Sequence, residues 1–419
     1  MKICIITNLY APHVRGGAEL IAETMAHGFI AAGDSVIIIS TKPTAGLSVE
    51  PAFAPPSAGL RTDKQASAES RIYRFLPLNI FYYLNDFKHC AAVRLLWHFF
   101  DMFNWHSAKV VAGILKNEKP DLVITHNLKG IGLLIPRAIA KLKLKHIHVL
   151  HDVQLVIPSG LILKNHEQDF SIVGWPTRIY AGICRWLFRQ VGCVVAPSKW
   201  LLDFYVRNGF FKNAQQRIIC NPVIAVETRY ISSLQRTGQF LFVGQIEKHK
   251  GVEWLVDIWR RRQFVERLLL VGNGSLLREL QHGYGTTDST DETTDNTDIK
   301  FVGKKMGQEL VEMYRAADFL IAPSLCYENS PTVIQSAFQN GVPVIVADIG
   351  GAAELVENKK TGFIFPSGDE DALVKILENI KTLSDEDYKK MSKQCLEKSR
   401  DWDVGIYIEA MIACRIVGW

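Results

Sequence analysis

Short, almost wholly apolar segments alternate with helix-like stretches along this chain, and this alternation leaves few folds open to it. In the first part, "KICIIT" (2–7) precedes a segment with Ile21, Met25 and Phe29 at helical spacing, and "SVIIIS" (35–40) follows. Further apolar segments occupy 121–126, 146–151 and 193–198. Continuous apolar strands separated by helices are typical of a parallel sheet that helices cover on both faces.

A second series of the same kind begins near residue 238. Strand-like segments recur until residue 348, and a helix is expected over 250–262. Because 419 residues are too many for one compact core, we predict two α/β domains, 1–222 and 238–400. A C-terminal helix, 402–419, is expected to pack back on the first domain. Expected loops are 43–70, the join at 222–237 and the Thr- and Asp-rich insertion 284–298, which we interpret as disordered.

Composition excludes several classes of protein. A hydrophobic content of 48% with 22% charged residues is ordinary for a soluble enzyme, and no apolar run reaches the roughly 20 residues that span a bilayer. The opening "MKICIITNLY" is a poor signal peptide. The eight cysteines are scattered without a Cys-x-x-Cys pair, which favours reduced thiols in a cytoplasm over disulfides or a zinc site.

Charge is unevenly distributed along the chain. Residues 1–200 carry 22 Lys and Arg against 13 Asp and Glu. This basic half suits phosphate-bearing ligands or an anionic membrane surface, or is simply a solvated surface. The aromatic segment 81–106 and the basic segment 136–148 fit peripheral docking on an inner leaflet, or a buried helical subdomain with a basic helix end. No nucleic-acid-binding motif accompanies the charge.

Loops at the ends of the predicted strands are the places where a parallel sheet binds ligands. Gly16 and Gly17 precede a helix whose amides could approach a phosphate, or they only make a tight turn. In "GQIEKHKG" (244–251), Lys248 and Lys250 are candidate phosphate partners or solvated lysines.

The stretch "ENSPTVIQSAF" (328–338) predicts the start of a helix. Ser330 suits the N-cap and Pro331 the first helical position. The expected buried and polar faces are Val333, Ile334, Ala337 and Phe338, and Thr332, Ser336 and Gln339, respectively. The positive helix end favours an anion beside Asn329 and Ser330, yet Glu328 lies there. Glu328 either complements the helix dipole or accepts hydrogen bonds from hydroxyls next to a bound phosphate, which is the pattern of a nucleotide sugar.

Two histidines end strands of the basic half. His126 and His151 each close an apolar segment, and His151 is followed by Asp152. A histidine at a strand end is either a plain hydrogen-bonding residue or part of a site, and two in one series favour the site.

Together these segments resemble family 4 glycosyltransferases, the retaining enzymes of GT-B fold. The resemblance covers nearly the whole chain and rests on "GGAE", "HD" at 151–152, "APSKWL", "NPV", "FVGQIEKHKG", "LLLVGNG" and "ENSPTVIQSAFQNGVPVIVADIGGAAELV". It implies two Rossmann-like domains with the active site between them. The N-terminal domain would bind the acceptor and the C-terminal domain the nucleotide sugar.

The resemblance also implies roles for individual residues. Glu328 matches the first acid of the family's Glu-x7-Glu motif, which contacts donor-sugar hydroxyls, and Lys250 matches the diphosphate-binding lysine. His151 matches the histidine beside the reacting sugar. The remaining implied positions are Gly16 and Gly17 near the donor phosphate, Asn329, Ser330, Pro331 and Thr332 around the diphosphate, and His126 and Asp152 on the acceptor side.

The resemblance implies no obligatory metal or other cofactor, and "DED" at 369–371 is expected to begin a helix. Two positions depart from the family pattern. Ser336 stands where the second Glu usually binds the ribose diol, and Gln245 stands where an Arg usually accompanies the lysine. A serine hydroxyl makes fewer and weaker hydrogen bonds than a carboxylate, so donor affinity is open.

The expected function is transfer of a hexose or amino-hexose, with retention, from an NDP-sugar to a glycan or lipid-linked oligosaccharide of a surface polysaccharide. UDP is favoured over GDP, and the enzyme is expected in the cytoplasm or on the inner face of the membrane. The alternatives are a nucleotide-sugar epimerase of GT-B fold and a degenerate, non-catalytic partner protein.

Overall fold

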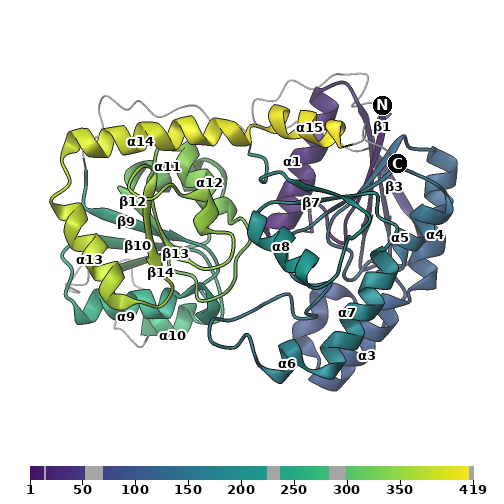
Figure 1. Ribbon diagram of the computed structural model, residues 1–419, viewed down its shortest axis with the longest axis horizontal. Helices are drawn as coiled ribbons and strands as arrows, with labels where there is room; N and C mark the ends of the chain where they lie inside the picture. Colours follow the sequence, from purple (N-terminus) through teal and green to yellow (C-terminus); the bar gives the residue numbers. More distant parts are fainter. Residues whose placement is uncertain (14–15, 52–68, 224–235, 283–298, 415–419) are drawn as a thin grey trace. The chain divides into compact units, whose positions relative to one another are not determined.

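The chain forms two compact units. The computed structural model describes residues 1–13, 16–51, 69–223, 236–282 and 299–414 (Figure 1). Unit 1 comprises Met1–Leu161, Gln168–Ile224 and Val404–Trp419, and unit 2 comprises Ile162–Glu167 and Ala225–Asp403. The expected insertion 284–298 and most of the expected join at 222–237 lie outside the described residues.

Unit 1 is built on an eight-stranded sheet in the order β3-β4-β2-β1-β5-β6-β7-β8. All neighbouring strands are parallel except β3, which runs antiparallel to β4. The strands are β1 (Lys2–Ile6), β2 (Ser35–Thr41), β3 (Ser48–Pro51), β4 (Arg71–Phe75), β5 (Leu122–Thr125), β6 (His146–Val149), β7 (Cys193–Ala196) and β8 (Gln215–Ile218). The central strands are buried along almost their whole length, which is why they are continuous apolar runs in the sequence.

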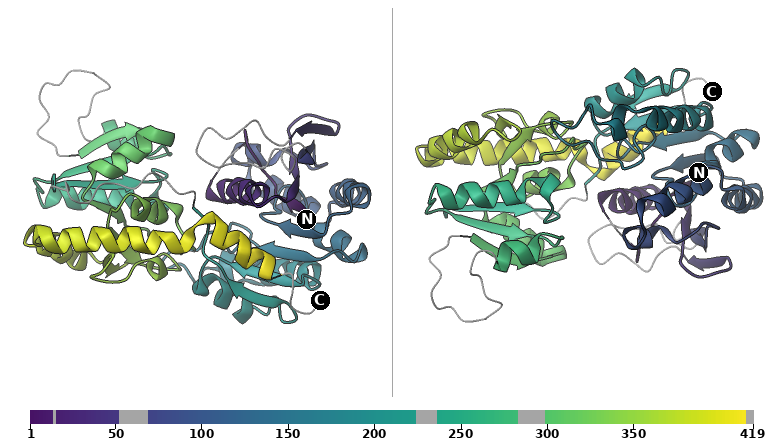
Figure 2. Two further views of the ribbon diagram at one scale, coloured as in Figure 1. Left: turned by 90° about the horizontal axis from the view of Figure 1, so that it is seen from above. Right: turned by 90° about the horizontal axis from the view of Figure 1, so that it is seen from below.

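The helices of unit 1 connect these strands. They are α1 (Gly17–Ala31), η1 (Tyr83–Lys88), α3 (Ala91–Met102), α4 (Trp105–Glu118), α5 (Ile135–Lys141), α6 (Phe170–Val173), α7 (Trp175–Phe188), α8 (Lys199–Arg207) and α15 (Val404–Ala413). Helix α15 packs beside α1 (Figures 1 and 2). A Cβ on Gly28 of α1 would lie 2.7 Å from Val404 and 2.8 Å from Ile408, so the glycine permits this close packing.

Unit 2 contains a six-stranded, fully parallel sheet in the order β11-β10-β9-β12-β13-β14. Its strands are β9 (Gln239–Val243), β10 (Arg267–Val271), β11 (Ile299–Gly303), β12 (Phe319–Ala322), β13 (Val344–Asp348) and β14 (Gly362–Pro366). Its helices are η3 (Lys248–Lys250), α9 (Val252–Arg261), α10 (Leu277–His282), α11 (Gly307–Ala316), α12 (Thr332–Gln339), η4 (Ala353–Leu355), α13 (Glu370–Lys381), α14 (Asp385–Ser399) and η5 (Arg400–Trp402). Helices α12 and α14 lie on one side of the sheet, and α9 and α10 lie on the other (Figure 1).

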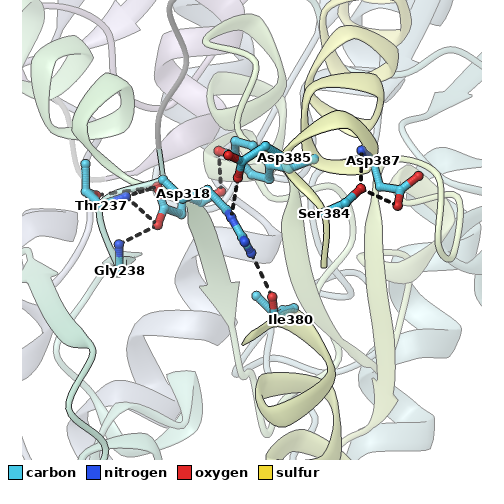
Figure 3. Close-up of polar contacts among 9 residues, drawn as sticks. Thr237, Gly238, Asp318, Ile380, Ser384, Asp385 and Asp387 are labelled. Carbon is cyan, nitrogen blue, oxygen red and sulfur yellow. Dashed lines mark hydrogen bonds and ion pairs between the residues drawn. The ribbon is translucent and has the colours of Figure 1, made fainter. Parts of the chain in front are cut away.

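A buried aspartate anchors the first strand of unit 2. The carboxylate of Asp318, just before β12, accepts hydrogen bonds from the amides of Thr237 at 3.0 Å and Gly238 at 2.7 Å (Figure 3). These two residues lead into β9, which pairs with β12. Asp318 therefore ties the beginning of β9 to its neighbour in the sheet.

Strand order brings particular loops together in each unit. In unit 1 the chain moves outward from β1 to β2 and β4, and then returns to place β5 against the other side of β1. In unit 2 it moves from β9 through β10 to β11, and then places β12 against the other side of β9. Such a reversal opens a crevice at the carboxyl ends of the two central strands, where ligands of open α/β sheets bind.

The structure confirms the two-sheet α/β fold and corrects several details. Residues 48–51 lie in β3, although 43–70 was expected to be a loop; this edge strand lacks the apolar pattern of a buried strand because it is largely exposed. Strands β4, β8 and β14 were not expected. The predicted first domain, 1–222, included residues 162–167, which belong to unit 2. An isolated β-bridge between Leu163 and Cys326 is one of the contacts that hold them there.

Candidate active site

An ion pair lies at the point of unit 2 where strand order reverses. Lys250 Nζ lies 3.0 Å from Glu328 Oε2, and their side chains are 24% and 15% exposed. Lys250 ends the loop after β9, and Glu328 lies in the loop after β12. Because β9 and β12 are neighbours in the sheet, two residues far apart in the sequence meet at its carboxyl edge.

Glycines allow these two loops to approach each other. Gly251 has a φ of +72°, and a Cβ there would lie 2.0 Å from the carbonyl oxygen of Pro323. A Cβ on Gly350, whose φ is +67°, would lie 2.2 Å from the carbonyl oxygen of Glu328. The backbone of Glu328 also accepts a hydrogen bond from the amide of Gly351 at 2.6 Å. The position of Glu328 is therefore set by backbone packing that a side chain would block.

Both members of the pair are charged at neutral pH. Burial alone would raise the pKa of Glu328, but Lys250 and a hydrogen bond from Ser324 together lower this pKa below its ordinary value. Burial alone would lower the pKa of Lys250, but Glu328 raises it above its ordinary value. The site thus holds a carboxylate that accepts hydrogen bonds and an ammonium group that can attract an anion.

Residues 162–167 support the Glu328 loop, and sequence reasoning missed them. The amide of Lys164 donates to Leu325 O at 2.9 Å, and the amide of Tyr327 donates to Ile162 O at 3.0 Å. The phenol of Tyr327 donates to Glu167 at 2.9 Å. These contacts form a short strap along residues 325–327. No local sequence pattern could indicate that residues 162–167 contact residues 325–327, which lie far away in the chain.

The helix after Glu328 begins one residue later than expected. Pro331 is the N-cap of α12 rather than its first residue, and Ser330 precedes the cap. Among the described residues, no side chain caps α12 and no acid lies in its first turn. Its positive end therefore faces the loop of Asn329 and Ser330, with Thr332 as its first residue, and suits an anion.

The buried face of α12 also differs from the prediction. Gln335 is completely buried together with Ile334, Ala337 and Phe338, whereas Val333 is only half-buried. Ser336 is half-buried and lies within hydrogen-bonding reach of the Tyr314 hydroxyl. Because that hydroxyl also donates to Val333 O at 3.3 Å, Ser336 belongs to a small polar contact on α12.

Gln245 stands where the family pattern has an Arg, and the loop after β9 offers no second cation in its place. Gln245 is exposed. Lys248 is 74% exposed and lies 3.9 Å from Glu253, so we do not assign it to the site. Burial and the nearby charge of Lys250 lower the pKa of His249, which is therefore neutral at physiological pH. Lys250 remains the cation of this loop that pairs with Glu328.

In unit 1 the two predicted strand-end histidines are in contact. His126 Nδ1 lies 2.8 Å from His151 Nε2, and the rings stack with their centroids 5.1 Å apart. Burial lowers the pKa of His151 to about 4 and that of His126 well below its ordinary value. Both imidazoles are therefore neutral near pH 7, and they suit hydroxyl groups better than phosphates.

A small cavity adjoins this histidine pair. Its volume is about 20 Å³, enough for one water molecule, and it is lined by His126, His151, Asp152, Lys129 and Tyr205 among others. Burial raises the pKa of Asp152 to about 6, and its carboxylate accepts from the amide of Gln154 at 2.8 Å. The structure thus brings His126, His151 and Asp152 together within unit 1.

The backbone amides at the start of α1 are less available to a phosphate than the sequence suggested. Gly16 is the N-cap and Gly17 the first residue of the helix. The amide of Gly16 donates to Glu19 Oε2 at 2.8 Å, so an internal carboxylate already occupies one donor at this helix end. A phosphate here would compete with Glu19 for that amide.

Sequence comparison covers both units. Residues 15–225 match the model of "Glycosyltransferase Family 4", and residues 237–382 match that of "Glycosyl transferases group 1". A Klebsiella pneumoniae protein described as "Uncharacterized 42.6 kDa protein in cps region" is 25% identical over 361 residues, which cover 85% of this chain and 87% of that protein. The Escherichia coli UDP-Gal:alpha-D-GlcNAc-diphosphoundecaprenol alpha-1,3-galactosyltransferase is 28% identical over 130 residues, 31% of each chain.

Structural comparison agrees with the sequence families. The structure of Anabaena HepE in complex with UDP matches with a TM-score of 0.66 and 17% identity, over 99% of both chains. At 17% identity the match supports only the assignment of the fold, which is the GT-B fold. With one family model spanning residues 15–225 and another matching unit 2, the chain is a glycosyltransferase of GT-B fold that belongs to glycosyltransferase family 4.

Proposed function

We propose that this glycosyltransferase moves a hexose or amino-hexose from an NDP-sugar to a glycan or lipid-linked oligosaccharide during surface-polysaccharide synthesis. UDP is the proposed nucleotide, transfer proceeds with retention, and the enzyme acts in the cytoplasm or at the inner face of the membrane. The observation that carries the proposal is the Lys250–Glu328 pair beside the amino end of α12.

The two members of the pair suit different parts of a nucleotide-sugar donor, the diphosphate and the sugar. A diphosphate binds where positive charge gathers, at Lys250 and at the amides that begin α12. Glu328, ionised and mostly buried, repels phosphate and accepts hydrogen bonds from the hydroxyls of the sugar. Asn329, Ser330 and Pro331 lie between Glu328 and α12, Thr332 is the first residue of the helix, and in the proposal these four residues surround the diphosphate. Ser336, one turn along α12, lies beside the ribose.

The leaving group supplies the base in this scheme. As the bond between the sugar and the diphosphate breaks, negative charge develops on the diphosphate oxygen, and Lys250 with the α12 amides stabilises it. That oxygen takes the proton of the acceptor hydroxyl, which attacks from the same face of the sugar. We propose that these groups do the work of a metal ion, so transfer needs no obligatory metal.

The histidines of unit 1 serve hydroxyl recognition in the proposal. His151, held by His126, is neutral at physiological pH and can hydrogen-bond a hydroxyl of the reacting sugar without charge. Asp152 lies beside it on the acceptor side. Gly16 and Gly17 contribute backbone near the donor phosphate only if the Glu19 carboxylate gives up the Gly16 amide.

Two similar proteins support the choice of substrates. The name of the E. coli relative specifies a UDP-galactose donor and a diphosphoundecaprenol-linked acceptor. HepE, which has the same fold, was solved with UDP. The K. pneumoniae relative is encoded in a cps region, which supports a role in a surface polysaccharide.

Nucleotide binding tests the proposal directly. Titration calorimetry with UDP and GDP should show binding of UDP, and Lys250→Gln should weaken it about tenfold or more, since a charge-assisted contact is lost. Lys248→Gln, in the same loop but exposed and beside Glu253, is the matched control and should bind as the wild type does. Absence of binding by any nucleoside diphosphate or NDP-sugar would instead favour a non-catalytic partner protein. Consumption of an NDP-sugar without acceptor would favour an epimerase.

A further inference from the structure

Helix α3 of unit 1 turns an apolar face to solvent. Leu95, Leu96, Phe99 and Phe100 are 70%, 56%, 56% and 53% exposed. Their spacing places Leu95 above Phe99 and Leu96 above Phe100, so the four side chains form one stripe. The solvent-facing side of a surface helix is ordinarily polar, and this arrangement is the reverse.

The opposite side of α3 is firmly packed, so the stripe is not a consequence of a loose helix. Trp97 is 2% exposed, and its indole donates to Phe81 O at 2.8 Å. Asp101 is 1% exposed and accepts from the amide of Gly130 at 2.9 Å. Helix α3 therefore has one correctly buried side and one exposed apolar side.

Helices α6 and α7 add to the same end of unit 1. The ring of His98 on α3 lies 6.4 Å from that of Tyr180 on α7, and Figure 1 draws α3, α6 and α7 at one end of the unit. All the exposed Phe and Trp side chains among the described residues lie on α3, α6, α7 or the first turn of α4: Phe99, Phe100, Trp105, Phe170, Trp175 and Trp186. We call these six residues with Leu95 and Leu96 the aromatic face.

The helices that carry the aromatic face expose more basic than acidic residues, and the exposed acid that adjoins them is Asp169, the N-cap residue of α6. Among their described residues, the only acids are Asp101, which is buried, and Glu118, which is 13% exposed and pairs with Lys2 at 2.9 Å. Their exposed cations are Arg94, Lys109, Lys116, Arg178 and Arg185. In addition, the guanidinium of Arg137 on α5 lies over the ring of Trp186 at 4.5 Å.

We propose that the aromatic face docks on the surface of an anionic lipid bilayer. Exposed aromatic and leucine side chains enter the boundary between headgroups and acyl chains, while the surrounding cations meet anionic headgroups. A second copy of this chain is a poor occupant, because two copies of a basic face would repel each other. The proposal extends the proposed action on a lipid-linked acceptor, since it holds the enzyme where such an acceptor lies.

The surface differs from the one expected from sequence. Within 81–106, Tyr83, Trp97 and Met102 are buried, so only part of that segment is available. In the basic segment 136–148, His146 and His148 are buried in β6. The contribution of α6 and α7 was not expected, because their apolar residues read as ordinary core positions.

Vesicle co-sedimentation of the full chain tests the proposal. The protein should bind vesicles of phosphatidylglycerol and phosphatidylcholine more tightly than vesicles of phosphatidylcholine alone, and raised salt should weaken binding. Leu95→Gln with Phe99→Gln should abolish most binding. Val265→Gln with Met306→Gln, at unit 2 positions that are 78% and 64% exposed, is the matched control and should leave binding unchanged. Arg94→Gln with Arg178→Gln, both at exposed positions, should weaken binding to the anionic vesicles about fivefold per arginine.

Three outcomes would overturn the proposal. These are equal binding to both kinds of vesicle, unchanged binding by the Leu95 and Phe99 variant while its thermal unfolding matches the wild type, and a dimer in light scattering that this variant abolishes. The last result would assign the aromatic face to a second copy of the chain. Because the vesicles contain no nucleotide sugar or acceptor, failure here leaves the proposed donor chemistry intact, and failure of nucleotide binding leaves the docking surface intact.

Discussion

At the scale of single residues, the site of unit 2 depends on charge that is only partly shielded from water. Glu328 and Lys250 lie 3.0 Å apart, and each keeps the other ionised against the effect of burial. A bound donor would enter this pair and replace part of it by contacts to hydroxyls and phosphate. In the proposed function, the two side chains that pair with each other are also the ones that contact the hydroxyls and the phosphate of the donor.

Glu328→Gln should lower the turnover of sugar transfer about 100-fold or more while nucleotide binding persists, because the amide keeps the shape but loses the charged acceptor. Steady-state kinetics with the donor found by calorimetry would measure it. Glu253→Gln, whose carboxylate lies 3.9 Å from Lys248, is the control and should retain wild-type turnover. Near-wild-type turnover of the Glu328 variant would contradict the assignment of this site.

Ser336→Glu should tighten binding of the nucleoside diphosphate about fivefold, since a carboxylate can accept both ribose hydroxyls. Calorimetry on the variant measures the change. Gln339→Glu, further along α12, adds the same charge away from the amino end and controls for charge alone. Weaker binding by the Ser336 variant would mean that the ribose does not lie beside this position.

At the scale of elements, hydrogen bonds at the amino edge of the unit 2 sheet hold the strands whose carboxyl ends carry the site. Asp318 holds the residues that lead into β9, while Arg236 donates to Asp385 at 3.3 Å and to Ile380 O at 2.8 Å (Figure 3). Strand β9 carries the loop of Lys250, and β12 carries the loop of Glu328. Pairing of these two strands is therefore the element-level condition for the site.

Asp318→Ala should destabilise unit 2 by about 2–3 kcal/mol, because it leaves the amides of Thr237 and Gly238 without their charged acceptor. Urea unfolding followed by circular dichroism would measure the loss. Asp385→Ala is the matched control, since Asp385 is 71% exposed in its pair with Arg236 and such pairs contribute about 0–1 kcal/mol. Equal costs for the two variants would contradict the anchoring role of Asp318.

At the scale of the whole molecule, buried histidines make the stability of unit 1 depend on pH. The sheet of unit 1 encloses four neutral histidines, since His146 and His148 both bond to Thr125, at 2.7 and 2.8 Å, behind the His126–His151 pair. Burial lowers the pKa of His146 to about 3. An unfolded chain takes up a proton at each histidine below about pH 6.5, whereas the folded chain does not. These residues therefore remove stability from unit 1 as the pH falls.

His146→Gln should cost about 2 kcal/mol less at pH 5 than at pH 7, because the variant no longer keeps an unprotonated imidazole in the fold over that range. Urea unfolding of wild type and variant at the two pH values measures the difference. Asn117→Gln, at an exposed position of α4, involves no titratable side chain and is the control, so it should cost the same at both. A pH-independent cost for the His146 variant would show that His146 can be protonated in the folded state.

Most of the buried strands, and the residues that could carry chemistry, could be predicted from the sequence alone. Continuous apolar runs identified most of the buried strands, and Glu328, Lys250, His126 and His151 were all found at strand ends. These are local properties, because the apolar pattern that indicates a buried strand or a helix involves only residues close together in the sequence. Which loops meet could be seen in the folded structure but not in the sequence, since strand order depends on pairing between distant segments. The tertiary structure placed Lys250 against Glu328, tied residues 162–167 to the Glu328 loop, made Pro331 the cap of α12, and showed which aromatic side chains of unit 1 are exposed.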